Sequence, residues 1–227
     1  MLYATHARIH LAAIRGNLQR IRAAVGPDRK VLIAVKANAY GHGAVEVSRM
    51  AEAEGCADWL GVATVPEGLE LRAAGIGLPI LKLGPTFPEE MPAAVEGRIT
   101  LAVCSQPEAE ALQAAARQVG VRALAHLKVD TGMGRVGVSP EEAPEVARML
   151  DAMPEVELGG IFTHLPVSDA ADTAFTKAQI ARFKATVDAV QAALGRELLA
   201  HCANSGAVLG HGDAWMGMVR PGIMIYG

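Results

Sequence analysis

The chain has 227 residues, of which 51% are hydrophobic, 20% are charged and only 4% are aromatic. Its 21 Lys and Arg against 24 Asp and Glu give a formal net charge of −3, which argues against a nucleic-acid-binding protein, and no polybasic run indicates a membrane surface. Three widely separated cysteines without a CxxC motif argue against a disulfide framework or zinc cluster, and neither a signal peptide nor a membrane span is evident. We therefore expect a cytoplasmic protein.

Short apolar runs alternate with longer segments rich in Ala, Leu, Glu and Arg. The runs predicted to be buried strands are residues 31–35, 59–63, 80–83, 99–103, 123–129, 158–162, 198–202 and 217–220. The main segments predicted to be helices are residues 12–25, 43–55, 66–75, 106–119, 140–151 and 173–194. This alternation predicts an α/β fold with parallel strands, as a TIM-like (β/α)8 barrel or, alternatively, a doubly wound open sheet.

The two ends of the chain do not fit a closed barrel. Residues 2–11 (LYATHARIHL) are predicted to form an extra N-terminal strand, and the chain ends at residues 223–227 without an eighth helix. We therefore divide the chain into an N-terminal strand, residues 1–11, and an α/β barrel, residues 12–227.

Polar and glycine residues follow the predicted strands, where α/β folds place their active sites. Lys36 directly follows the first strand, and a lysine partly removed from water there has a lowered pKa and can form a Schiff base. Lys82 and Lys128 also interrupt apolar runs and are rival nucleophiles. Ser205 and the Gly222–Ile223 amides follow the last two strands, where barrels often bind phosphate.

Two further patterns are weak. Residues 132–137 contain G-x-G-x-x-G, but the next helix is predicted to start only near residue 140, which disfavours a dinucleotide site. His164, His201 and His211 match no zinc-ligand spacing, which disfavours a metal site.

Together these motifs resemble the alanine racemase family along nearly the whole chain. Residues 34–43 (AVKANAYGHG) are similar to the family's pyridoxal-phosphate lysine motif, which is highly specific. Later blocks follow in the family's order: residues 128–135 with Gly137, residues 163–164, His201, residues 203–205, and residues 220–223 with residues 226–227.

The resemblance implies a fold-type III barrel that binds pyridoxal 5′-phosphate and interconverts L- and D-alanine, supplying D-alanine for peptidoglycan. Lys36 would bind the cofactor and act on the alanine α-proton on one face, and Arg220 would face the pyridine nitrogen. The other residues implied to contact the cofactor are Tyr40, Arg135, His164, Asn204, Ser205, Gly222 and Ile223. Lys128, carbamylated in many members, and His201 would support them.

The resemblance also implies what lies outside this sequence. The family continues into a β-rich C-terminal domain that is absent here, that pairs with the N-terminal strand, and that carries a tyrosine acting on the opposite face in a homodimer. Without that domain we expect weak racemase activity or none. The expected partner is therefore alanine and a second subunit, with no nucleic acid or membrane. The alternatives are a single-domain pyridoxal-phosphate carrier without defined catalysis, and a metal-dependent D-amino-acid aldolase or other barrel lyase.

Overall fold

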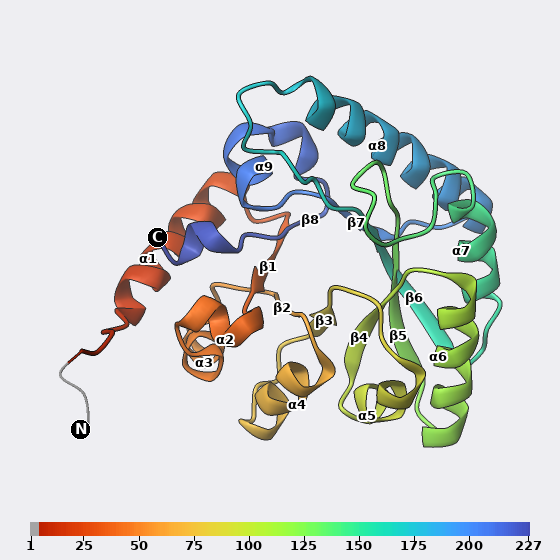
Figure 1. Ribbon diagram of the computed structural model, residues 1–227, viewed down its shortest axis with the longest axis horizontal. Helices are drawn as coiled ribbons and strands as arrows, with labels where there is room; N and C mark the ends of the chain where they lie inside the picture. The colour runs from red at the N-terminus through yellow and green to blue at the C-terminus, as the bar shows by residue number, and fades with distance from the viewer. Residues whose placement is uncertain (1–4) are drawn as a thin grey trace.

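A computed structural model describes residues 5–227 and contains one sheet of eight parallel strands that curls into a nearly closed barrel (Figure 1). The strand order is β7-β6-β5-β4-β3-β2-β1-β8. The strands are β1 (Lys30–Ala34), β2 (Trp59–Val62), β3 (Ile80–Lys82), β4 (Ile99–Val103), β5 (Ala123–Lys128), β6 (Val156–Phe162), β7 (Leu199–His201) and β8 (Met218–Val219). All eight predicted strands are present, with ends within two residues of the prediction.

The two ends of the strand order meet and make the fold a barrel. Strand β8 pairs with β1 in parallel, so the last strand lies beside the first. On its other side, Gly217 N–H donates to Ala200 O at 3.1 Å and Arg220 N–H donates to Ala203 O at 2.8 Å, which joins β8 to the β7 region. A doubly wound sheet reverses its strand order at a switch point, and this sheet does not. The fold is therefore the predicted TIM-like barrel.

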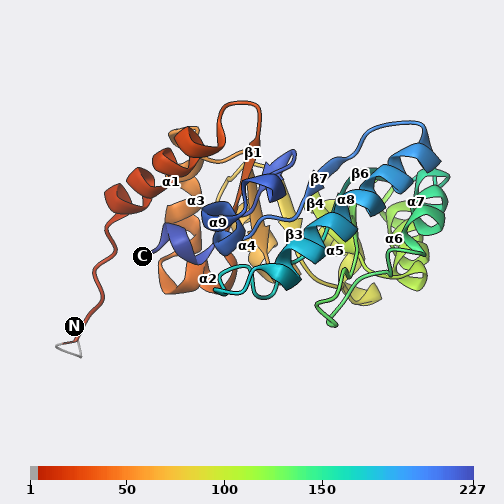
Figure 2. The same ribbon diagram turned by 90° about the horizontal axis from the view of Figure 1, so that it is seen from above.

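Helices surround the barrel, as Figures 1 and 2 show. They are α1 (Leu11–Val25), α2 (Lys36–Gly41), α3 (Ala44–Ala53), α4 (Val65–Ala73), α5 (Met91–Glu96), α6 (Gln106–Val119), α7 (Ala143–Asp151), α8 (Ala174–Leu194) and α9 (Ser205–Gly210). Three short 3₁₀ turns are Pro88–Glu90, Gly212–Ala214 and Ile223–Ile225. The helix predicted over residues 140–151 begins later, at Ala143. Reciprocal hydrogen bonds between Ser139 and Glu142 stabilise a turn that precedes this helix.

The core lies mainly between the strands and the helices and is aliphatic, as the composition requires. Val31 and Ile33 of β1 belong to this outer core, whereas Leu32 belongs to a separate small cluster with Leu81 and Met218. Since successive side chains of a strand point to opposite faces, this second cluster lies inside the barrel. A strand residue can therefore line a pocket at the centre of the barrel only if its side chain points inward, as that of Leu32 does.

The predicted N-terminal strand is not present in the part of the chain that the structure describes. Residues 5–10 form no strand, Leu11 is already helical, and residues 2–4 lie outside the described residues. Figures 1 and 2 show the segment before α1 extending away from the barrel. A strand requires a neighbouring strand for its hydrogen bonds, and residues 5–10 have none within the described chain. Among residues 5–227, no helix combines the length and hydropathy needed to cross a lipid bilayer.

Candidate functional site

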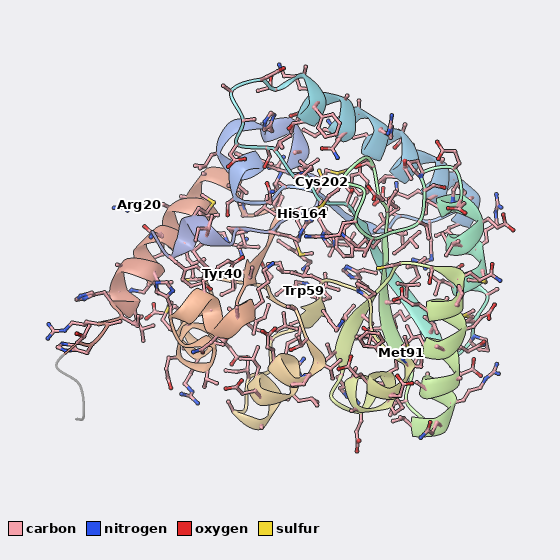
Figure 3. All side chains as sticks on the ribbon, viewed as in Figure 1. Arg20, Tyr40, Trp59, Met91, His164 and Cys202 are labelled. Carbon is pink, nitrogen blue, oxygen red and sulfur yellow. The ribbon has the colours of Figure 1, made fainter. Side chains whose placement is uncertain are left out.

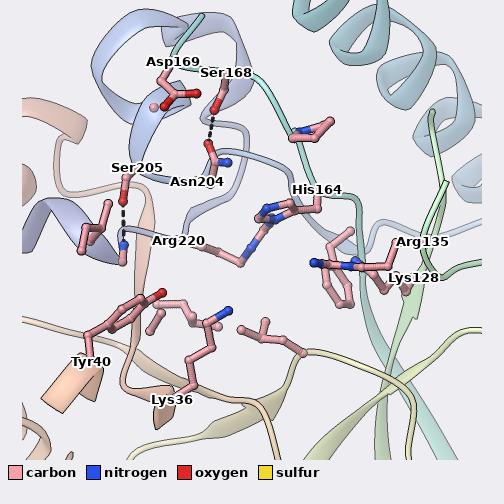
Figure 4. Close-up of a pocket in the computed structure, with 18 residues that line it drawn as sticks. Lys36, Tyr40, Lys128, Arg135, His164, Ser168, Asp169, Asn204, Ser205 and Arg220 are labelled. Atoms are coloured by element: carbon pink, nitrogen blue, oxygen red, sulfur yellow. Dashed lines mark hydrogen bonds between the residues drawn. The ribbon is translucent and has the colours of Figure 1, made fainter. Parts of the chain in front are cut away.

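A pocket of about 370 Å³ opens where the strands end at their C-terminal side (Figure 4). It contains all nine residues that the sequence predicted to contact a cofactor, together with Lys128. Its lining residues are Leu32, Ala34, Lys36, Tyr40, Leu83, Lys128, Arg135, Phe162, His164, Pro166, Ser168, Asp169, Asn204, Ser205, Gly206, Arg220, Gly222 and Ile223. Of the three lysines weighed as nucleophiles, Lys36 and Lys128 reach the pocket. Lys82 is buried elsewhere, where its amine donates to the carbonyl oxygens of Gly84 and Pro85.

Lys36 begins a left-handed turn, which the sequence analysis did not predict. Residues 37–40, labelled α2 with their neighbours, all have φ between +51° and +54°. Such a conformation costs non-glycine residues roughly 1–2 kcal/mol each, so other contacts must stabilise it. Asn38 Oδ1 accepts from the backbone N–H of Ala44 at 2.8 Å. His42 Nδ1 lies 3.0 Å from Ala39 O and 3.1 Å from Tyr40 O. The turn places Lys36 and Tyr40 on the same wall of the pocket (Figure 4).

Glu67 on α4 stabilises the same turn through hydrogen bonds to backbone N–H groups. Its carboxylate accepts from the backbone N–H of Ala37 at 2.8 Å, of Ala63 at 2.7 Å and of Thr64 at 3.1 Å. The last contact belongs to a capping box at the start of α4, a pattern that the sequence T-V-P-E at residues 64–67 could have revealed. The contact with Ala37 joins segments 30 residues apart and has no local signature in the sequence.

The pocket is strongly cationic although the chain as a whole is slightly acidic. Lys36, Lys128, Arg135 and Arg220 line it, and Asp169 is the only carboxylate among its lining residues. Burial, followed by the charge of Arg220, lowers the pKa of Lys128 to about 7. Burial and the same charge lower the pKa of His164 to about 3, so His164 is neutral at physiological pH. An excess of fixed positive charge in a partly desolvated cavity favours an anionic ligand.

Arg220 lies at the floor of the pocket, and no carboxylate of residues 5–227 pairs with it. Its guanidinium is buried and donates to Thr163 O at 2.7 Å, Cys202 O at 3.2 Å and His201 Nδ1 at 2.9 Å. It also lies over the Phe162 ring, 5.4 Å from the centroid. These contacts fix the orientation of the guanidinium while leaving its charge uncompensated. His201 does not line the pocket, and its hydrogen bond with Arg220 places it in the network around that guanidinium that the resemblance implied.

Lys128 occupies the opposite wall. Its amine lies 4.3 Å from the centroid of the Phe162 ring, and no ion pair with a carboxylate forms within residues 5–227. A buried lysine with a depressed pKa holds a large fraction of free amine near neutrality. Such an amine is reactive toward carbon dioxide as well as toward aldehydes.

A cradle of backbone and hydroxyl groups forms at the end of β8. Ser205 Oγ accepts from the backbone N–H of Gly222 at 2.9 Å and of Met224 at 3.4 Å. A Cβ atom on Gly222 would lie 3.0 Å from the Tyr40 hydroxyl, so glycine allows the hydroxyl to approach the backbone. Asn204 caps α9 through its interaction with Ala207 N–H at 3.1 Å. Hydroxyls next to the start of a 3₁₀ turn suit a phosphate group.

The loop after β5 shows why G-x-G-x-x-G at residues 132–137 is not a dinucleotide motif. Asp130 accepts from the backbone N–H groups of Gly132, Met133 and Arg135 at 2.8–3.0 Å, so the glycines form a turn and do not open a helix. Gly137 has φ +130°, and a Cβ there would lie 2.7 Å from Asp130 N. The loop directs Arg135 toward Lys128 (Figure 4).

The histidines do not form a metal site. Within residues 5–227, no group of three His, Cys, Asp or Glu side chains could hold a metal ion. His201 is instead bonded to Arg220 and to His126, whose Nδ1 lies 3.0 Å from His201 Nε2. His126 was not identified from the sequence, because it lies inside the apolar strand β5 and no motif flanks it.

Comparisons with known proteins agree with this geometry. A family model described as alanine racemase, N-terminal domain, matches residues 9–227. An alanine racemase of Cutibacterium acnes is 50% identical over 98% of this chain and 60% of its own length, and one of Desulfovibrio desulfuricans is 44% identical over 97% and 59%. The structure of an alanine racemase of Clostridium difficile in complex with cycloserine matches with a TM-score of 0.96 and 37% identity, covering 100% of this chain and 62% of that one. This chain therefore spans about 60% of the length of these relatives.

Proposed function

This chain belongs to the alanine racemase family, as its N-terminal barrel domain, and we propose that it is the pyridoxal-phosphate-binding part of an enzyme that interconverts L- and D-alanine. The observation that carries the proposal is the cationic pocket that combines a lysine at the end of β1 with a phosphate cradle at the end of β8. The relatives are named racemases, which favours this function over the pyridoxal-phosphate carrier considered from the sequence.

The residues present fit pyridoxal phosphate. Its phosphate suits the cradle of Tyr40, Ser205 and the Gly222 and Ile223 backbone, with Asn204 holding the start of α9 beside it. Its aldehyde suits the Lys36 amine. When bound, the cofactor supplies that aldehyde and an aromatic ring that withdraws electrons from the substrate's α-carbon.

Arg220 is placed to select the reaction outcome. A guanidinium donates hydrogen bonds but does not accept a proton, so Arg220 facing a pyridine nitrogen holds that nitrogen unprotonated. An unprotonated ring withdraws electrons less strongly, which favours return of the proton to the α-carbon over side reactions. Arg135, with Lys128 beside it, would hold the phenolic oxygen of the cofactor. His164 lies between these two arginines in Figure 4.

Racemisation requires a proton to leave one face of the α-carbon and to return to the other. We propose that Lys36 serves one face. The Tyr226 hydroxyl donates to Ala34 O at 2.8 Å and Tyr40 lies at the phosphate cradle, so neither is available for the other face. We propose that the second group comes from outside residues 5–227, in keeping with a homodimer in which a C-terminal domain completes the site. We place the enzyme in the cytoplasm, supplying D-alanine for peptidoglycan.

An absorbance titration tests the cofactor assignment. Adding pyridoxal phosphate to the purified chain should produce a visible band from the cofactor joined to a lysine. The band should be lost in Lys36→Ala. It should be retained in the control Lys82→Met, because Lys82 is buried outside the pocket and methionine is similar in volume to lysine. A band of unchanged intensity in Lys36→Ala would refute the assignment.

A further inference from the structure

Three buried polar side chains form a line inside the barrel, running away from the pocket. Arg220 donates to His201 Nδ1, and His201 Nε2 lies 3.0 Å from His126 Nδ1. The exposed fractions of Arg220, His201 and His126 are 6%, 0% and 2%. The interior of such barrels is usually filled by bulky aliphatic residues, so a polar line there requires an explanation other than packing.

The position of each proton in this line follows from Arg220. A guanidinium only donates, so His201 Nδ1 must be an acceptor and the His201 proton must be on Nε2. His201 Nε2–H then donates to His126 Nδ1, which places the His126 proton on its own Nε2. Burial and the charge of Arg220 lower the pKa of both imidazoles far enough to keep them neutral. The line therefore ends in a neutral N–H donor, for which residues 5–227 offer no hydrogen-bond partner.

The backbone of β6 is shaped around that donor. The register between β5 and β6 shifts at Ala125 and His126, which leaves Gly159 as the unpaired residue of a bulge. A Cβ on Gly160 would lie 2.7 Å from the His126 ring, so only glycine fits there. A Cβ on Gly159 would lie 3.7 Å from His126 Nε2, which places the Gly159 backbone beside the free N–H. The two glycines thus make room around His126.

This N–H reaches a second cavity, of about 240 Å³, at the N-terminal end of the barrel. We call it the N-terminal cavity, and its lining residues are Trp59, Pro79, Thr100, Leu124, Ala125, His126, Glu157, Gly159 and Leu199. The Trp59 ring lies 5.3 Å from the His126 ring, and Figure 3 shows Trp59 toward the middle of the molecule. Thr100 is 2% exposed, and its hydroxyl has no hydrogen-bond partner among residues 5–227. The cavity therefore combines aromatic and aliphatic walls with two unpartnered polar groups.

We propose that the N-terminal cavity is a binding site for a small, neutral aromatic molecule that carries a hydroxyl group. The hydroxyl oxygen would accept from His126 Nε2–H, and its proton would be available to Thr100. A cation would face the N–H of His126, which can only donate, and the Glu157 carboxylate at the cavity is already paired with Arg122 at 3.3 Å. An anion would face that same carboxylate. The ring would pack against Trp59, Leu124 and Leu199. The site is distinct from the pocket that holds Lys36, and its existence does not depend on cofactor binding.

Phenol is the simplest probe of this class, and Trp59 is the natural reporter. The chain has two tryptophans, and Trp215→Phe leaves Trp59 as the only one. This substitution loses no hydrogen bond within the described chain, where the Trp215 indole N–H has no partner. Phenol should change the Trp59 emission saturably, with a dissociation constant of roughly 1 mM. Toluene, which has a similar shape without the hydroxyl, should bind about 5-fold more weakly because one hydrogen bond is lost.

Two variants test the location of the site. Gly159→Ala leaves the His126 hydrogen bonds intact but covers Nε2, and should weaken phenol binding about 10-fold. Gly16→Ala, where a Cβ meets nothing within 4 Å, is the matched control and should leave binding unchanged. Should Gly159→Ala fail to fold, His126→Phe provides the same test by removing the donor. NMR of the ¹⁵N-labelled histidines should show the His126 Nε2 signal moving with phenol. A linear, unsaturable response, equal binding of toluene, or unchanged binding in the blocking variant would overturn the proposal.

Discussion

The carboxylate of Glu67 accepts a hydrogen bond at 2.8 Å from the backbone N–H of Ala37, the residue that follows Lys36. Helix α4 thereby holds the left-handed turn of the pocket in place. Glu67→Ala removes the acceptor for three backbone N–H groups, and we expect the free energy of unfolding to fall by about 2–3 kcal/mol. Glu70→Ala, on the exposed side of the same helix, should change it by less than about 0.5 kcal/mol. Equal values for the two variants in urea unfolding would contradict this role.

The buried Lys128 makes stability depend on pH. Its pKa is about 7 in the folded chain because of burial and the charge of Arg220, against roughly 10.4 when unfolded. Between pH 7 and 10 the Lys128 amine carries a proton in the unfolded state but not in the folded state. The unfavourable contribution of Lys128 to the free energy of unfolding therefore shrinks as the pH rises through this range, and below pH 7 it is constant. In buffers purged of carbon dioxide, the native chain should therefore gain stability with pH relative to Lys128→Met, by up to about 1.4 kcal/mol per pH unit. Parallel curves for the two proteins would show that Lys128 is not desolvated as described.

The same amine should react with carbon dioxide. The nitrogen forms a bond to the carbon of carbon dioxide and releases one proton, giving a carbamate whose negative charge Arg135 and Arg220 can stabilise. With ¹³C-labelled bicarbonate at pH 8, we expect a carbamate resonance from the native chain that is absent in Lys128→Met. A resonance of equal intensity in both would assign the reaction to another amine.

Two tyrosine hydroxyls near the cradle should have different effects. The Tyr40 hydroxyl lines the pocket, whereas the Tyr226 hydroxyl donates to Ala34 O at 2.8 Å. A hydrogen bond to a charged group contributes roughly 1.5–3 kcal/mol, so Tyr40→Phe should weaken pyridoxal-phosphate binding about 10-fold or more. Tyr226→Phe should lower the stability of the chain and leave the affinity nearly unchanged. The absorbance titration measures both, and similar affinities for the two variants would remove Tyr40 from the phosphate site.

Much of the fold was predictable because its signals are local. Runs such as residues 99–103 are apolar throughout, and Ser105 and Gly120 mark the ends of α6, so this strand and helix appear in the structure with the predicted bounds. Residues 5–10 of the strand predicted over residues 2–11 form no strand in the described chain, where no neighbouring strand is present to bond with them. The pairing of this segment with a C-terminal domain stays a prediction.

The site was predictable in its lining but not in its support. Ten of the eighteen lining residues lie in motifs that follow the strands, and the resemblance named those ten. Ser168 and Asp169, which also line the pocket, lie outside these motifs and were not named. Glu67 and His126 act across 30 and 75 residues, respectively, on Ala37 and His201, so no local pattern identifies them. The left-handed turn over residues 37–40 was also unpredictable, because only one of its residues, Asn38, is of a type that favours positive φ.

The reaction itself should separate into two parts in this chain. A base on one face can exchange the α-proton of only one alanine enantiomer, the one whose proton points toward it, so under the proposed function we expect Lys36 to exchange one enantiomer and to need a second group to form the other. In ²H₂O with pyridoxal phosphate, each enantiomer is tested separately, and we expect deuterium incorporation into one of them to exceed its conversion to the other by about 10²-fold or more. A version of the chain extended by the C-terminal domain of a relative should bring the two rates together. Conversion as fast as exchange in residues 1–227 alone would contradict the need for a second group.

Lys36 is the residue that we propose binds pyridoxal phosphate, and peptide mapping tests this assignment most directly. The chain is mixed with the cofactor, reduced with borohydride to make the bond permanent, digested and analysed by mass spectrometry. We expect the cofactor mass on the peptide that contains Lys36. Labelling of Lys128 or Lys82 in its place would contradict it.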